Sequence, residues 1–207
     1  TIKEFNYTTK KKDAVTRCPD IKFDCKDILR EKLKHFASKE ALNIDGFGKK
    51  IIQNFWDSKM IKFPADIFNL NFKNISKMDG WGDLSASNLK KAIEESKNIS
   101  LDKFIFSIGI RHIGQENAKT LAKYFLNISK FAELFEKSQR KKILNYLLEL
   151  DGIGETQINS LQTFFSNSAN LNTVSNLIKR LNVSSFKTSK SGIFYGKTIM
   201  FTGGLSK

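Results

Sequence analysis

Cysteine and proline are scarce in this chain of 207 residues, which holds only two of each. Two cysteines are too few for the disulfide framework that stabilises small secreted domains, and this favours a reducing compartment. No apolar run reaches the roughly 18 residues of a membrane-spanning helix, and no signal peptide or amphipathic anchor stands at the start. We therefore expect no association with a membrane.

Acidic residues are also in deficit. Lys and Arg number 35 and Asp and Glu number 21, so the formal net charge is 35 − 21 = +14. Such an excess lies on the surface and attracts polyanions. Nucleic acid is therefore the first partner to expect, and an anionic membrane or scaffold is a weaker alternative. The first residue is Thr, which suggests a piece of a longer chain.

Glycine is concentrated in four short turns, which contain eight of the 12 glycines. The turns are Asp45-Gly46-Phe47-Gly48, Asp79-Gly80-Trp81-Gly82, Gly109-Ile110-Arg111-His112-Ile113-Gly114 and Asp151-Gly152-Ile153-Gly154. Their last glycines stand at 48, 82, 114 and 154, at intervals of 34, 32 and 40 residues. Apolar residues four and seven positions after each last glycine share one face of a helix. The repeat therefore predicts a helix after each turn and a short helical run before it, such as 38–42 and 102–106.

This unit resembles the helix-hairpin-helix motif, h-x-G-h-G-x-x-x-A, which binds DNA without sequence specificity. Glycine lets the chain reverse through positive φ and lets another backbone come close. The first N–H groups of the second helix lack partners, and with the positive end of the helix dipole they form an anion site. Four copies in register predict an all-α fold of tandem hairpins, of which about two or three contact phosphate while the others act as spacers.

Eleven residues are the predicted DNA contacts. They are Gly46, Gly48, Lys49, Lys50, Gly80, Gly82, Arg111, His112, Gly114, Gly152 and Gly154. The third copy has Arg111-His112 where the others have Asp-Gly, so Arg111 is the side chain most readily placed on DNA. His112 fits a contact and a buried, hydrogen-bonded role equally well, whereas His35 on an amphipathic helix is predicted to be structural.

The apolar residue between the paired glycines differs from copy to copy. Phe47, Trp81, Ile113 and Ile153 occupy this position, which indicates packing inside each hairpin. A minor-groove wedge is the less favoured alternative for Trp81.

Lys77-Met78-Asp79-Gly80 matches the K-x-D-G signature of nucleotidyltransferases, in which the lysine is adenylated. The position of Lys77 is not shared by the repeat, because Asn43, Gly109 and Glu149 occupy it in the other copies. No further carboxylates and lysines of a nucleotide pocket surround it. We therefore interpret the match as chance and predict no catalytic residue in this chain.

The remaining segments suggest further elements. Residues 26–37, 129–149 and 168–181 have helical patterns, 183–192 is rich in Ser and Lys like a linker, and 198–202 (TIMFT) indicates a strand. Cys18 and Cys25 are half of a tetrahedral zinc site or, alternatively, two buried thiols.

Ordered motifs give a resemblance to the C-terminal half of bacterial NAD-dependent DNA ligases. The motifs are Arg17-Cys18 through Cys25, EKLKHFASKEALNIDGFGKKII at 31–52, FIFSIGIRHIGQENAKTLAKYF at 104–125 and GKTIMFTGGLS at 196–206. They are similar, in that order, to the end of the family's zinc finger with its first hairpin, its third hairpin, and the opening strand of its BRCT domain. The zinc finger departs from the family, because its first cysteine pair is absent and its last pair is spaced by six residues instead of five.

The resemblance implies a domain order: a partial zinc finger at 1–26, the hairpin domain at 27–182, a linker at 183–192 and the start of a truncated BRCT domain at 193–207. It also implies zinc at Cys18 and Cys25 as a half-site, and a monomeric protein of the bacterial cytoplasm. The parent enzyme would seal nicks in duplex DNA with NAD and Mg in an adenylation domain that this chain lacks. The fragment would then grip DNA without being catalytic. The alternative is a hairpin module of a repair nuclease or junction-binding protein.

Overall fold

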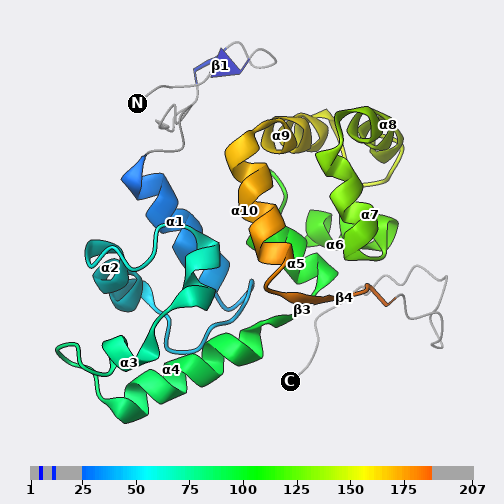
Figure 1. The fold of residues 1–207 in the computed structure, drawn as a ribbon. Coiled ribbons are helices and arrows are strands. Elements are labelled where there is room, and N and C mark those ends of the chain that lie inside the picture. The colour runs from blue at the N-terminus through cyan, green and yellow to red at the C-terminus, as the bar shows by residue number, and fades with distance from the viewer. Residues whose placement is uncertain (1–4, 7–10, 13–24, 188–207) are drawn as a thin grey trace, which may run out of the picture.

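The computed structural model describes residues 5–6, 11–12 and 25–187 (Figure 1). Its elements are β1 (Phe5–Asn6), β2 (Lys11–Lys12), α1 (Lys26–Ala37), α2 (Lys49–Asp57), η1 (Pro64–Asn69), α3 (Phe72–Ile75), α4 (Asp83–Ser96), β3 (Asn98–Ser100), α5 (Leu101–Ser107), α6 (Gln115–Phe125), α7 (Ile128–Ala132), η2 (Glu133–Phe135), α8 (Lys137–Leu147), α9 (Glu155–Ser166), α10 (Ser168–Ile178) and β4 (Asn182–Ser184). The predicted all-α class with tandem hairpins is confirmed. Among the described residues, the helix pairs α1–α2, α3–α4, α5–α6 and α8–α9 each flank one glycine turn.

The helices form two groups that two short strands join. In Figure 1, α1 to α4 lie on one side and α6 to α9 on the other, with α5 and α10 between them. Strand β3 follows α4 and pairs in parallel with β4, which follows α10; the central pair of residues is Ile99 and Val183. This pairing ties the end of the second hairpin unit to the end of the fourth. A separate antiparallel pair, β1 and β2, lies near the N-terminus.

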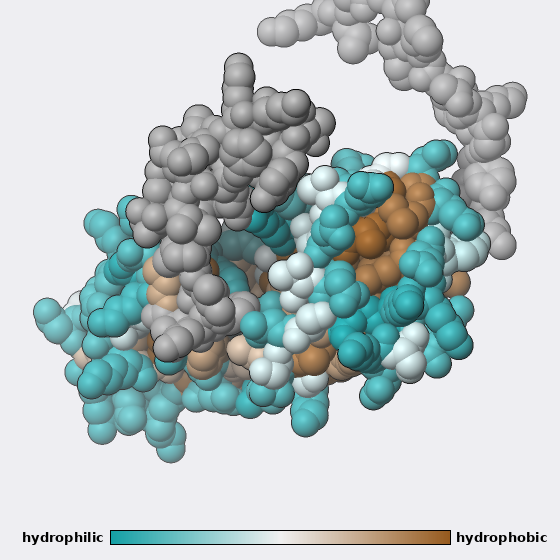
Figure 2. Space-filling model, turned by 90° about the horizontal axis from the view of Figure 1, so that it is seen from above, coloured by the Kyte–Doolittle hydropathy of each residue, from teal (hydrophilic) through white to brown (hydrophobic). Residues whose placement is uncertain are grey.

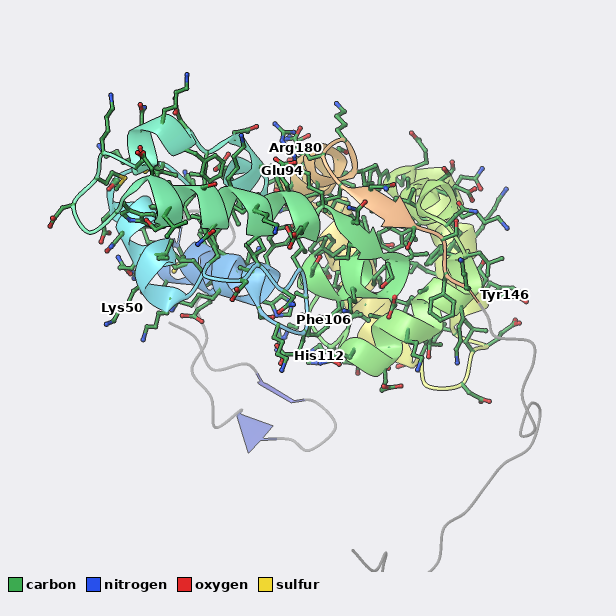
Figure 3. All side chains as sticks on the ribbon, turned by 90° about the horizontal axis from the view of Figure 1, so that it is seen from below. Lys50, Glu94, Phe106, His112, Tyr146 and Arg180 are labelled. Carbon is green, nitrogen blue, oxygen red and sulfur yellow. The ribbon has the colours of Figure 1, made fainter. Side chains whose placement is uncertain are left out.

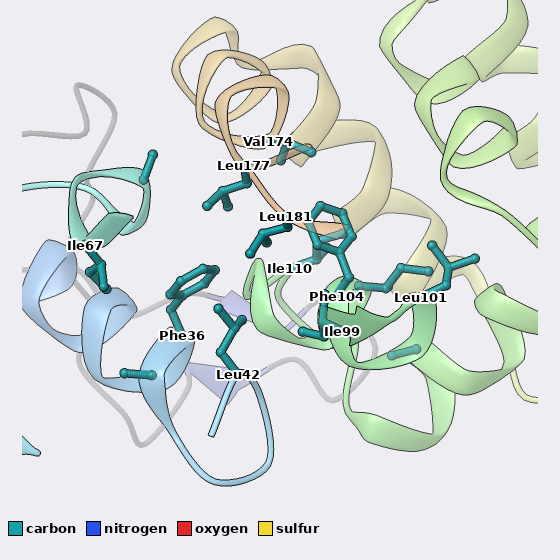
Figure 4. Close-up of a cluster of buried hydrophobic side chains, with 14 of the residues drawn as sticks. Phe36, Leu42, Ile67, Ile99, Leu101, Phe104, Ile110, Val174, Leu177 and Leu181 are labelled. Carbon is teal, nitrogen blue, oxygen red and sulfur yellow. The ribbon is translucent and has the colours of Figure 1, made fainter. Parts of the chain in front are cut away.

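The core runs through both groups. Figure 4 shows side chains of α1, η1, α5 and α10 converging, among them Phe36, Ile67, Phe104 and Leu177, each of which is 0% exposed. Six of the fully buried large side chains are phenylalanines, whose rings meet mostly edge to face. One continuous apolar core therefore holds the four hairpins in fixed relative positions.

Two helical predictions are corrected. Residues 38–42 form turns instead of a helix, because Ser38 is extended (φ −60°, ψ 162°) and its carbonyl accepts the Asn43 N–H at 2.8 Å. The segment 129–149 is not one helix, since Glu136 is also extended (φ −78°, ψ 123°) and separates η2 from α8. The prediction for 26–37 is confirmed as α1.

The linker expected at 183–192 also needs a correction, because its first residues belong to β4. The rest of it beyond residue 187, the expected BRCT strand at 198–202 and Cys18 all lie outside the described residues. Within the described part of the chain, no helix is both long and apolar enough to cross a bilayer.

Candidate nucleic-acid interface

All four glycine turns have the same backbone geometry. In each, the residue before the last glycine donates its N–H to the carbonyl three residues earlier. The pairs are Phe47 to Ile44 at 3.2 Å, Trp81 to Met78 at 3.0 Å, Ile113 to Ile110 at 3.1 Å and Ile153 to Leu150 at 3.1 Å. This bond closes a four-residue turn (44–47, 78–81, 110–113 and 150–153), whose third residue has positive φ every time: 72° at Gly46, 75° at Gly80, 62° at His112 and 86° at Gly152. One left-handed residue at this position is the pattern of a type II turn.

The third copy therefore keeps the turn without its glycine. His112 adopts the left-handed conformation that glycine adopts in the other copies. Its carbonyl accepts a hydrogen bond from Asn117 Nδ2 at 3.1 Å, which ties the turn to α6. A left-handed histidine carries backbone strain that glycine would avoid, and such strain is concentrated at functional sites.

The last glycine of each turn is not required by the fold. Gly48, Gly82, Gly114 and Gly154 are the N-caps of α2, α4, α6 and α9 and are extended, a conformation open to any residue. A Cβ would meet nothing within 4 Å at the first three, and only the end of the Gln157 side chain at Gly154. Ser, Asp and Asn are better N-caps than glycine. An outside group that approaches the backbone closely would explain glycine at these positions.

The apolar residue between the glycines packs inside its hairpin, as predicted. Phe47, Ile113 and Ile153 are at most 5% exposed. Trp81 is half-buried and stacks on Phe55 with ring centroids 5.6 Å apart. These side chains anchor each turn to the core, so the turn's polar backbone is left on the surface.

The hairpins differ in whether the N–H of the last glycine has a partner. Ser85 Oγ accepts the N–H of Gly82 at 2.9 Å and donates to its carbonyl, while Gln157 Oε1 accepts the N–H of Gly154 at 3.1 Å. Within the described residues, no side chain occupies the N–H of Gly48 or Gly114. Sequence reasoning missed Ser85 and Gln157, although a polar residue three positions after a helix N-cap is the signal for such a bond.

The local charge also separates the first and third hairpins from the second and fourth. Six residues, counted from the second position of the hydrogen-bonded four-residue turn, carry −1 + 2 = +1 at 45–50, 1 − 1 = 0 at 111–116 with His neutral, and −2 at both 79–84 and 151–156. Lys34, Lys39 and Lys49 also line an open hollow of about 520 Å³ beside the first turn. The first and third hairpins are therefore the less repulsive to phosphate.

A second left-handed residue marks the same two hairpins. Asn43 (φ 51°) and Gly109 (φ 68°) lie five residues before the last glycine of the first and third copies, whereas Lys77 and Glu149 lack positive φ. A Cβ at Gly109 would lie 3.4 Å from Cδ2 of the His35 ring, whose Nε2 is 2.8 Å from the Phe106 carbonyl oxygen. His35 thus joins α1 to the end of α5, which confirms its predicted structural role.

Every predicted DNA contact is exposed at a hairpin tip or in the first turn of the following helix. Figure 3 shows Lys50 and His112 on one edge of the domain and Glu94 and Arg180 on the opposite edge. Figure 2 shows another face, where hydrophilic side chains predominate and the largest apolar area lies toward one end. The structure thus places residues of the first and third hairpins on a common side.

The predicted zinc ligands are only partly described. Cys25 is half-buried and directly precedes α1, while Cys18 lies outside the described residues. The described part of the chain contains no group of three or more His, Cys, Asp or Glu side chains placed for a metal. A closed zinc site therefore cannot be assembled from these residues. Lys77 is exposed in the turn that leads to the second hairpin.

Four like turns, each joining two helices, define a tandem helix-hairpin-helix domain. A family model described as "Helix-hairpin-helix motif" matches residues 103–174, which span the third and fourth hairpins. Proteins named DNA ligase are similar to the whole chain: one from Pelagibacter ubique is 49% identical over 100% of this chain and 30% of its own length. Those from Ehrlichia canis and Rickettsia canadensis are 44% and 38% identical over 88% and 93% of this chain.

The chain spans about 30% of the length of these relatives. It is therefore homologous, over its full length, to a segment of DNA ligases. The resemblance to that class of enzyme is confirmed.

Proposed function

We propose that this chain is the DNA-gripping segment from the C-terminal half of a bacterial NAD-dependent DNA ligase. The parent enzyme would seal nicks in duplex DNA during replication and repair in the cytoplasm. This segment would hold the duplex as a monomer, without regard to sequence. The support is the similarity to DNA ligases over the whole chain together with four exposed hairpins on a protein of net charge +14.

The observation that carries the proposal concerns the backbone N–H groups at the tips of the first and third hairpins. The N–H groups of Gly48 and Gly114 have no side-chain partner in the described residues, and each stands at the positive end of a helix of nine or eleven residues. A phosphate oxygen can accept hydrogen bonds from these N–H groups and from the next N–H groups in the first turn of the helix. Lys49 and Lys50 add charge at the first hairpin and Arg111 at the third.

The two kinds of hairpin would then have different roles. The first and third would bind phosphates directly, because no side chain among the described residues accepts the N–H of Gly48 or Gly114. The second and fourth, with Gly80, Gly82, Gly152 and Gly154, would approach the duplex less closely. Phosphate and backbone amide contacts read no bases, so the grip would be indifferent to sequence.

The proposed enzyme would also need a metal ion and cofactors. Zinc would be held by Cys18 and Cys25 with ligands from outside this chain, and it would fix the segment that leads into α1. NAD would supply the adenylate and Mg would support its transfer in the adenylation domain of the parent enzyme. No residue of this chain takes a catalytic role, so the segment alone would not seal a nick.

Binding to nicked duplexes of unrelated sequence tests the proposal. We expect the 207-residue chain to bind several scrambled duplexes with equal affinity. The logarithm of the association constant should fall linearly with the logarithm of the salt concentration, by about 0.9 for each phosphate neutralised. Fluorescence anisotropy between low and physiological salt gives this slope. Affinity that does not change with salt, or that depends on sequence, would contradict the proposal.

A further inference from the structure

A cavity of about 490 Å³, open on one side, is lined by residues of α1, α10, the end of α5 and the turn that follows α5. This volume lies within the range of small-molecule sites in proteins, and a junction between two groups of helices is a common place for them. Most of the lining is apolar, including Ile28, Ile110 and Val174. Figure 4 shows Ile110 on the turn that follows α5 and Val174 on α10.

The uncharged polar side chains of the lining already donate hydrogen bonds to acceptors within the protein. Ser107 donates its hydroxyl hydrogen to the Phe104 carbonyl at 2.8 Å, and Thr173 donates to the Ala169 carbonyl at 2.9 Å. His35 Nε2 lies against a carbonyl oxygen, which can only accept, so this nitrogen carries the ring hydrogen. The lone pairs of these groups remain as acceptors.

Asn170 adds a buried acceptor that lacks a donor. The residue is 8% exposed and its Nδ2 donates to the Phe164 carbonyl at 3.1 Å. Its Oδ1 has no donor within the part of the chain that the structure describes. A buried polar atom without a partner costs free energy, which a ligand that supplies the partner would recover. An anion would meet only lone pairs at these uncharged side chains. The charged residues of the lining, Asp27, Glu31 and Lys32, add −2 + 1 = −1, so phosphates and nucleotides do not suit this cavity.

We propose that this cavity binds a small, flat, uncharged apolar molecule that carries one N–H or O–H donor, as an indole-type heterocycle does. The rings would lie against Ile110 and Val174, and the donor would bond to Asn170 Oδ1. Ile110 and Ile113 line the cavity with the buried side of the third hairpin. The occupant would therefore support that hairpin from behind without touching its exposed tip.

Indole and benzofuran form the matched pair of probes, since benzofuran keeps the shape and replaces the N–H with an oxygen. In a titration of the ¹⁵N-labelled chain followed by NMR, we expect indole to give saturable shifts at Ser107, Gly109 and the Asn170 side-chain amide. Benzofuran should bind at least about tenfold more weakly than indole, because the buried acceptor, Asn170 Oδ1, then stays unpaired. Equal affinities for the two probes, or shifts away from the cavity, would overturn the assignment.

A substitution that fills the cavity gives an independent readout. Ala169 is half-buried in the lining, whereas Asn172 on the same helix is exposed. Ala169→Phe should abolish the indole shifts, and Asn172→Phe, which adds a ring on the outer side of α10, should preserve them. Indole binding to a folded Ala169→Phe variant with unchanged affinity would reject the site. If that variant does not fold, the comparison of indole with benzofuran still decides.

Discussion

The first and third hairpins differ from the second and fourth although all four share one turn. In the first and third, the N–H of the last glycine has no side-chain partner among the described residues and the local charge is +1 or 0. In the second and fourth, Ser85 or Gln157 occupies that N–H and the local charge is −2. A left-handed residue five positions before the last glycine also separates the pairs.

This difference shows that the same turn can be repeated along a chain without every copy being suited to bind phosphate. The turn needs a left-handed third residue and an apolar side chain packed on the core, which is buried in three copies and half-buried at Trp81. Phosphate binding also needs unoccupied N–H groups and a local field that does not repel an anion. Ser85 and Gln157 serve the helix as caps, and the same bonds withdraw the N–H groups from a ligand.

A substitution at Gly114 gives the strongest test of the difference between the two pairs of hairpins. We expect Gly114→Val to weaken binding to nicked duplex DNA by about tenfold or more, because one N–H contact to a charged group contributes about 1.5–3 kcal/mol and the new side chain blocks it. Stability should change little, since Gly114 has φ −80° and open space around a Cβ. Anisotropy titration and thermal melting measure the two effects.

Gly82→Val is the matched control, because Gly82 is also an extended N-cap with open space. Its effect on DNA affinity should stay within about threefold, since Ser85 already occupies its N–H and the local charge repels phosphate. If both valine variants lose affinity equally, the hairpins are equivalent and the proposed division is wrong. Normal binding by Gly114→Val would make the third hairpin a structural spacer.

Lysine charge at the first hairpin gives the second prediction. The double substitution Lys49→Ala and Lys50→Ala should reduce the salt slope of DNA binding by about 2, because each lysine that neutralises a phosphate contributes about 0.9. Lys90→Ala together with Lys91→Ala removes the same charge from exposed positions on α4. This control should leave the slope nearly unchanged. Equal losses of slope would mean that net charge, and not the hairpin, sets the affinity.

The sequence allowed the four hairpins to be located, but it did not show which of them are best suited to bind phosphate. Glycine spacing and the apolar residues at +4 and +7 predicted all four turns and the helices after them, because both signals are local. The helical pattern of 26–37 likewise predicted α1. The exposed positions of the eleven candidate DNA contacts follow from the same register.

Elements that depend on distant partners were not predictable. Strand β4 has three residues, and it forms only because Ile99 lies opposite Val183, 84 residues away in the chain. Residues 38–42 contain good helix formers, yet the core requires the chain to turn after Ala37 so that Leu42 is buried. His112 gave no sequence signal for positive φ, since glycine is the usual residue there.

The smallest expected effect comes from Ser85→Ala, which removes the side-chain partner of the Gly82 N–H. Losing these exposed bonds should cost about 0.5–1.5 kcal/mol and lower the melting temperature by a few degrees. DNA affinity should stay within about twofold, because Asp79 and Asp83 still repel phosphate from the freed N–H. A clear gain in affinity would assign the weakness of the second hairpin to its cap alone. Adding Asp83→Asn to Ser85→Ala then separates charge from capping, since only the charge explanation predicts a further gain.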